Sequence, residues 1–162
     1  SGDLIVASYY RTFKLDTAIL RPFNNYGPRQ NTEKFAAIIP LTIKRILNNE
    51  NIIINGDGEQ TRDFIYVKDT ANAAIDLAKS NVIGKTINVG SGREITMNCL
   101  IDLIVKEFNY KGKIIHGLER SGDVRRHFAD ISLARKLINY SPKVRLEEGI
   151  KITCDWYKKN LK

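Results

Sequence analysis

The chain has 162 residues, of which 43% are hydrophobic and 27% are charged, as is usual for a globular domain with one sizeable core. It contains no internal repeat, no signal peptide and no apolar stretch approaching a membrane span, so we expect a soluble, cytoplasmic protein with no membrane partner. The net charge of +8 invites a nucleic-acid partner, but the basic residues are dispersed and no aromatic-interleaved RNA motif occurs, so we expect none.

Helices and strands are predicted to alternate, which favours an α/β class. Residues 3–13 are apolar nearly all round and predict a helix that is buried against something. Residues 17–20 predict a buried strand. The later predicted elements are a segment at 35–47 whose regular helix starts near Pro40, strands at 52–54 and 61–67, a helix to residue 79 with Asp69 as N-cap, a strand at 85–89, a helix to residue 108 with Thr96 as N-cap, a strand at 113–115, and helices at 132–137, capped by Asp130, and at 146–160.

A polar loop at residues 21–30 follows the first predicted strand. It holds two arginines, two amides and a Gly-Pro turn. In open α/β sheets ligands gather at the carboxyl ends of strands, so this loop is well placed to meet a polar ligand. On spacing alone, a polar loop without a ligand explains the pattern equally well.

Three motifs in order carry a family resemblance. They read R-P-F-N-N-Y-G-P-R-Q at 21–30, G-D-G-E-Q-T-R-D-F-I-Y-V-K-D at 56–69 and G-D-V-R-R-H-F-A-D-I-S-L-A at 122–134. Together they resemble the C-terminal half of the extended short-chain dehydrogenases that modify nucleotide-diphosphate sugars, the NAD-dependent epimerase/dehydratase family. The resemblance runs from about residue 1 to 157. It implies the last Rossmann elements and a substrate loop in residues 1–30, and a small mixed α/β substrate-binding domain in residues 31–162.

The resemblance also implies NAD as cofactor and a homodimer, with the first helix in a subunit interface. Tyr10 and Lys14 have the spacing of the family's catalytic Tyr-x-x-x-Lys, but Lys14 stands too close to Arg21, so we interpret both as structural and expect the chain to begin after the catalytic pair. Gly90-Ser91-Gly92 follows a predicted strand late in the chain and lacks the third glycine of a dinucleotide-binding turn. NAD would therefore be bound mainly by a preceding part.

The substrate contacts are carried over residue by residue. Arg62 and Arg120 match arginines that contact the diphosphate, for which a planar guanidinium is well suited; the alternative for Arg62 is an ion pair with Asp63 or Asp57. Asp123 matches a position near the ribose, or it caps its own turn. The other implied substrate contacts are Asn24, Ala37 (often asparagine in the family), Ile38, Asn55, Gln60, Asn88 (equally a residue that fixes its loop) and Arg126, and the implied cofactor contacts are Pro22 and Phe23.

The function implied for the whole protein is that of a UDP-glucose 4-epimerase, which oxidises the sugar transiently at C4 and returns the hydride. A dTDP-glucose 4,6-dehydratase is the alternative, because the residues that separate the two lie outside the chain. The chain alone, with no catalytic residue assigned, is expected to be inactive. A non-catalytic nucleotide-sugar binding module and a basic nucleic-acid-binding domain are the other hypotheses.

Overall fold

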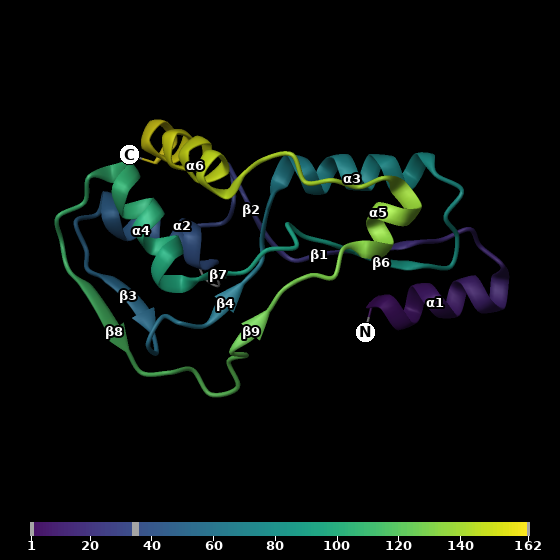
Figure 1. Ribbon diagram of the computed structural model, residues 1–162, viewed down its shortest axis with the longest axis horizontal. Coiled ribbons are helices and arrows are strands. Elements are labelled where there is room, and N and C mark those ends of the chain that lie inside the picture. Colours follow the sequence, from purple (N-terminus) through teal and green to yellow (C-terminus); the bar gives the residue numbers. More distant parts are fainter. Residues whose placement is uncertain (1, 34–35, 162) are drawn as a thin grey trace.

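The computed structural model describes residues 2–33 and 36–161, and its helices alternate with short strands (Figure 1). The predicted α/β class is confirmed. Figure 1 shows an elongated arrangement, with α1, α3 and α5 at one end and α2, α4 and α6 at the other. The helices are α1 (Gly2–Phe13), α2 (Ile38–Leu47), α3 (Val67–Lys79), α4 (Met97–Phe108), α5 (Ser132–Ile138) and α6 (Leu146–Asn160).

The strands pair in small sheets, mostly parallel and between distant parts of the chain. They are β1 (Ile19–Pro22) with β6 (Thr86–Val89), β2 (Asn24–Tyr26) with β5 (Phe64–Tyr66), β3 (Ile52–Asn55) with β8 (Ile114–Gly117), and β4 (Thr61–Arg62) between antiparallel β7 (Ile95–Thr96) and parallel β9 (Arg126–His127). The predicted division after residue 30 stays a prediction, although β1 pairs with β6 from beyond it.

Two expected strand features differ in the structure. The polar loop at 21–30 includes the end of β1 and all of β2, and β2 pairs with β5. The single strand predicted at 61–67 is divided at Asp63, which lies between β4 and β5. The side chain of Asp63 is fully buried and hydrogen-bonded to other loops, which explains the interruption.

The predicted N-cap at Asp69 is wrong. Tyr66 holds the N-cap position of α3, and Asp69 lies inside the first turn, buried. Its Oδ2 accepts hydrogen bonds from the backbone N–H groups of Lys143 (3.1 Å) and Val144 (3.0 Å). Asp69 therefore fixes the segment that leads into α6 and does not cap the start of α3.

The other predicted helix starts agree more closely. Thr96 caps α4, because its Oγ1 accepts the backbone N–H of Cys99 (3.1 Å). Ile131 and not Asp130 holds the N-cap position of α5, but Asp130 Oδ1 accepts the N–H of Ser132 (2.9 Å), a bond that lowers the pKa of Asp130. Pro40 is the third residue of α2, where its missing N–H is not needed, and Phe35 of the predicted segment lies outside the described residues.

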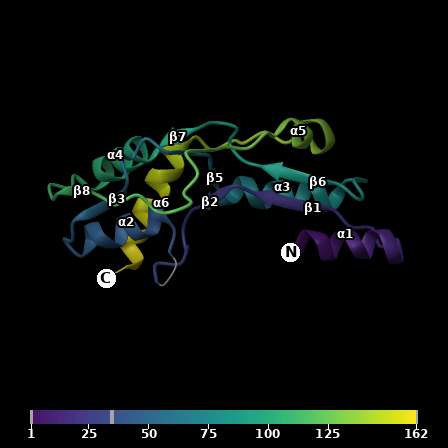
Figure 2. The ribbon, with the colours of Figure 1, turned by 90° about the horizontal axis from the view of Figure 1, so that it is seen from below.

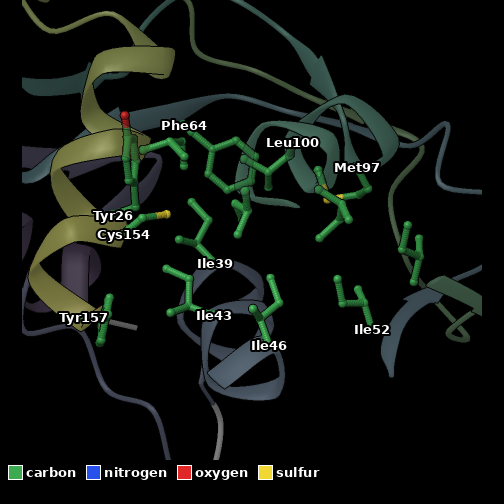
Figure 3. Close-up of a cluster of buried hydrophobic side chains, with 14 of the residues drawn as sticks. Tyr26, Ile39, Ile43, Ile46, Ile52, Phe64, Met97, Leu100, Cys154 and Tyr157 are labelled. Atoms are coloured by element: carbon green, nitrogen blue, oxygen red, sulfur yellow. The ribbon is translucent and has the colours of Figure 1, made fainter. Parts of the chain in front are cut away.

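The larger core lies between α2, α4 and α6. Ile39 and Ile43 of α2 are almost fully buried and point towards Leu100 of α4, and Cys154 and Tyr157 of α6 close the other side (Figure 3). A smaller core joins β6 to α5. It consists of Ile65, Ala73, Ile87, Val89, Ala129, Ile131, Ala134, Ile138 and Tyr140.

Helix α1 lies at the margin of the molecule, beside β1 (Figure 2). It contains no buried residue, and Leu4 and Phe13 are 77% and 62% exposed. Within residues 2–33 and 36–161, no helix has the length and apolar character required to cross a membrane.

Candidate functional site

A cavity of about 510 Å³ opens where the loop after β1, helix α2 and strands β3 and β4 meet. The larger core described above forms its floor, since Ile39 and Phe64 belong to both. Its lining residues are Asn24, Asn25, Tyr26, Gln30, Ala36, Ala37, Ile38, Ile39, Leu41, Arg45, Ile53, Ile54, Asn55, Gln60, Arg62, Phe64, Met97, Arg120 and Asp123.

Positive charge dominates this cavity. The charged residues in its lining are Arg45, Arg62, Arg120 and Asp123, a surplus of two positive charges. Arg62 is largely buried and pairs with Asp123. In the described part of the chain, the side chains of Arg45 and Arg120 have no ion-pair or hydrogen-bond partner. The cavity can therefore accept a dianion without breaking an existing ion pair.

Arg62 is held in place by β4 and by the loop before β9. Its guanidinium donates to the carbonyls of Thr61 (2.7 Å) and Val124 (2.5 Å) and to the carboxylate of Asp123. Its partner is thus neither of the two aspartates expected from the sequence. The carboxylate of Asp57 binds Arg125 instead (2.8 Å), which lowers the pKa of Asp57 to about 2.

Amide side chains line the rest of the polar wall. Asn24 donates from Nδ2 to the carbonyl of Asp63 (2.8 Å), and Gln60 donates from Nε2 to the carbonyl of Asn55 (2.8 Å). Gln30 donates in the same way to the carbonyl of Asn25 (3.0 Å). These bonds fix the amides on backbone groups, so the polar wall is largely pre-formed.

Helix α2 provides an apolar wall. Its Ile43 and Ile46 face the core, whereas Ile38, Leu41 and Arg45 follow one another at helical spacing along the cavity. Ile53 of β3, which is 39% exposed, also lines the cavity. One side of the cavity thus suits a flat or apolar group, and the other suits an anion.

Eight of the ten substrate contacts predicted from the sequence line this cavity, and their binding roles stay predictions. They are Asn24, Ala37, Ile38, Asn55, Gln60, Arg62, Arg120 and Asp123. The structure does not bring the other two there. Asn88 lies in β6, opposite Arg21 of β1. Arg126 is exposed in β9, and its guanidinium pairs with Glu94 (2.6 Å), which lowers the pKa of Glu94 to about 2.

Pro22 and Phe23 stand at the carboxyl end of β1. The Phe23 N–H donates to the carbonyl of Val89 (2.8 Å), and the Phe23 ring stacks on His127 with ring centroids 4.7 Å apart. A dinucleotide pyrophosphate would need free loop N–H groups. Those of Ser91 and Gly92 already donate to Asp63 (2.7 and 2.9 Å), so this loop does not fit a pyrophosphate.

Sequence reasoning missed Arg45 and Gln30 as cavity residues. Arg45 lies two helical turns after Ile38, so its spacing from Ile38 and Leu41 was the available signal. Gln30 was part of the first motif, but nothing local indicated that its carbonyl is held by the hydroxyl of Tyr157 (2.6 Å) in the last helix. Within the described residues, no cluster of His, Cys, Asp or Glu is arranged to hold a metal ion.

Comparisons with known proteins agree on one family. The model described as "NAD dependent epimerase/dehydratase family" matches residues 1–90. A putative UDP-glucose 4-epimerase of Methanocaldococcus jannaschii is 39% identical over 159 residues, covering 98% of this chain and 51% of that protein. The dTDP-glucose 4,6-dehydratase 1 of Escherichia coli is 34% identical, covering 100% of this chain and 46% of the relative.

A solved structure has the same fold. The UDP-glucose 4-epimerase of Thermotoga maritima, crystallised with UDP-glucose, superposes with a TM-score of 0.94 at 32% identity, covering 99% of this chain and 52% of that one. The chain spans about half the length of the relatives that it matches. Those relatives are of two kinds, epimerases and dehydratases.

Proposed function

Because the chain belongs to the NAD-dependent epimerase/dehydratase family, of whose extended members it matches the C-terminal half, we propose that its cavity binds a nucleotide-diphosphate sugar. One observation carries this proposal: the cavity holds three arginines and one aspartate. Their surplus of two positive charges balances the two negative charges of a diphosphate diester. Guanidinium groups suit such a ligand because they donate paired hydrogen bonds and stay charged.

The two walls of the cavity suggest how such a ligand lies. We place the diphosphate at Arg62 and Arg120, and a planar base against the apolar wall of Ile38, Leu41 and Ile53. Asp123 accepts hydrogen bonds from ribose hydroxyls in this arrangement. The amides of Asn24, Asn55 and Gln60 then serve the remaining polar groups.

For the whole protein we propose a UDP-glucose 4-epimerase, cytoplasmic and homodimeric. The relative that is 39% identical carries that name, whereas the dehydratase of Escherichia coli is 34% identical. The alternative is dTDP-glucose 4,6-dehydration. NAD would be held mainly by residues outside this chain, with Pro22 and Phe23 at its margin, so the chain alone would bind substrate without converting it.

Calorimetric titration with UDP-glucose, UDP-N-acetylglucosamine and dTDP-glucose tests the binding. Arg120→Ala is the informative variant. The Arg120 side chain has no partner among the described residues, so its removal leaves no other described group without a hydrogen-bond or ion-pair partner. We expect it to weaken binding about tenfold or more. Arg135→Ala removes one charge from the exposed face of α5 and is the matched control, with an expected change below about twofold.

Absence of binding to every nucleotide sugar in a folded sample contradicts the proposal, as does an equal loss in both variants. The preferred nucleotide then directs the assay of the full-length protein. Conversion of UDP-glucose to UDP-galactose supports the epimerase. Formation of a 4-keto-6-deoxy sugar from dTDP-glucose supports the alternative.

A further inference from the structure

Asp63 is a carboxylate with no exposed surface, at the point where β4 ends and β5 begins. It accepts hydrogen bonds from the N–H groups of Ser91 (2.7 Å), Gly92 (2.9 Å) and Ala129 (3.2 Å), and from the hydroxyl of Ser91 (2.5 Å). Within residues 2–33 and 36–161 no cationic side chain pairs with it. A buried carboxylate satisfied only by such donors is costly to displace, because every donor would lose its partner.

The backbone of the same residue binds a residue that lines the cavity. Its carbonyl accepts the side-chain N–H of Asn24 (2.8 Å) and the backbone N–H of Asn24 (3.2 Å), and its own N–H donates to the carbonyl of His127 (3.1 Å). Its chain neighbours Arg62 and Phe64 both line the cavity. Asp63 thus joins a buried hydrogen-bond cluster to two polar groups of the cavity wall.

The Gly90-Ser91-Gly92 loop, which the proposed function leaves without a role, is shaped around this carboxylate. A Cβ atom on Gly90 would lie 2.6 Å from Asp63 Oδ2 and 2.6 Å from the Cβ of Ala129. Gly92 has φ +70°, which disfavours other residues. These glycines allow the loop N–H groups to approach the Asp63 carboxylate. In other proteins the same arrangement of backbone N–H groups binds an anionic ligand such as phosphate.

We propose that Asp63, clamped by the Gly90-Ser91-Gly92 loop, is the positioning residue of the cavity: it fixes Arg62 and Asn24 where they meet the ligand. The proposal rests on the proposed function, since it concerns the affinity of that same site. Asp63 itself touches no ligand. Its effect on binding passes through Asn24, which its carbonyl binds, and through the backbone of Arg62, the preceding residue in the chain.

Asp63→Asn is the first test. The amide replaces one of the two carboxylate oxygens with an NH2 group, which faces loop N–H groups donor to donor, so the clamp weakens while the side-chain size is kept. Asp69→Asn is the matched control, because Asp69 is also a buried carboxylate that accepts two backbone N–H groups, yet neither of these partners lines the cavity. Both variants are expected to lower the melting temperature, and only Asp63→Asn to weaken nucleotide-sugar binding, by about tenfold.

A purely structural role predicts equal affinity losses in the two variants, and that result overturns the proposal. Ser91→Ala provides a milder change if Asp63→Asn does not fold, since it removes one donor and keeps both glycines. We expect it to weaken binding about threefold. An unchanged affinity in this variant, with an intact fold, also counts against the clamp.

A double-mutant cycle shows whether Arg62 carries the effect. In an Arg62→Ala background, Asp63→Asn should weaken nucleotide-sugar binding less than about threefold, because the arginine that it positions is already gone. If the loss of affinity in the double variant equals the product of the losses in the two single variants, Asp63 does not act through Arg62.

A ligand-free measurement separates this inference from the proposed function. In nuclear magnetic resonance spectra, the Asn24 side-chain amide and the Arg62 Nε–H signals should shift in Asp63→Asn and stay in place in Asp69→Asn. If no nucleotide sugar binds the wild type, the proposed function fails while these shifts still decide whether Asp63 positions the two groups. If the Asn24 and Arg62 signals do not shift in Asp63→Asn, the positioning role is wrong, whether or not a nucleotide sugar binds.

Discussion

At the scale of single residues, neighbouring positions of α2 have separate tasks. Ile43 and Ile46 are buried in the core, while Arg45 lies between them in sequence and lines the cavity. Lys44 points elsewhere and pairs with Glu33 (3.0 Å). One turn of helix thus carries a core residue, a surface ion pair and a cation of the candidate site that has no partner among the described residues.

Arg45→Ala should weaken nucleotide-sugar binding about three- to tenfold, because it removes a positive charge from the cavity. Lys44→Ala, one residue earlier on the same helix, removes the same charge outside the cavity and should change the affinity less than about twofold. Titration of both variants with UDP-glucose checks this prediction. Equal effects would show that only the overall charge matters.

The two cysteines should differ in reactivity. Cys154 is fully buried in the core, and burial raises the pKa of its thiol to about 12, whereas Cys99 is exposed on α4. At pH 8 the Cys154 thiol therefore stays protonated, and access to it is blocked. We expect a thiol reagent to modify one cysteine in the native protein and both in denaturant. Cys99→Ser should abolish the fast reaction, and rapid native labelling of that variant would contradict the buried position.

At the scale of elements, the sequence predicted the long ones best. The helices with apolar periodicity and the cap at Thr96 were recognised, because helical spacing and local capping depend on neighbouring residues. Strands β7 and β9 have two residues each, too few to show a period, and they exist only because β4 lies between them. The break at Asp63 depends on a loop far along the chain, which no local pattern records.

The same limit applies to the candidate site. Family motifs identified Arg62, Arg120 and Asp123, and these line one cavity. The motifs did not reveal that Asp123 is the ion-pair partner of Arg62, since that contact depends on how the loop before β9 folds over β4. Charge type is visible in sequence, but pairing requires the tertiary structure.

The turn between β3 and β4 gives a prediction about glycine. Gly58 has φ +77°, and a Cβ atom there would overlap the amide of Asn98, which is itself bonded to the carbonyl of Asp57 (3.0 Å). Gly58→Ala should lower the free energy of unfolding by about 2–4 kcal/mol. At Gly122 φ is +79°, and no heavy atom lies within 4 Å of an added Cβ atom. Gly122→Ala therefore meets backbone strain alone and should lower the free energy of unfolding by about 1 kcal/mol. Urea unfolding of both variants measures the difference, and equal costs would mean that the Asn98 contact is unimportant.

At the scale of the whole molecule, α1 is the element with least support from the rest. Its links to the body include an ion pair between Asp3 and Arg21 and the contact of the Tyr10 ring with Gly84. Lys14 follows the helix at φ 55°, past its last turn, and neither Tyr10 nor Lys14 lines the cavity. The exposed apolar side chains of α1 fit the homodimer interface proposed for the whole protein.

Replacing Ile5 and Phe13 by aspartate should weaken self-association with little loss of thermal stability, because neither side chain is buried. Ile75→Asp is the control, since Ile75 is an exposed apolar residue of α3. Sedimentation of the full-length protein over a range of concentrations measures the change. A wild type that stays monomeric throughout would contradict the interface, as would equal effects of the control.

The pairing of distant strands also governs the order in which a growing chain can fold. During synthesis β1 has to wait for β6, β3 for β8, and Gln30 for Tyr157, its hydrogen-bond partner 127 positions later. The segment that carries β1 and β3 therefore leaves the ribosome with unpaired strand edges, which favour aggregation until the later strands are made. Because α6 is synthesised after the other described elements, a chain that stops short of it would leave the floor of the cavity without its cover and open to proteases.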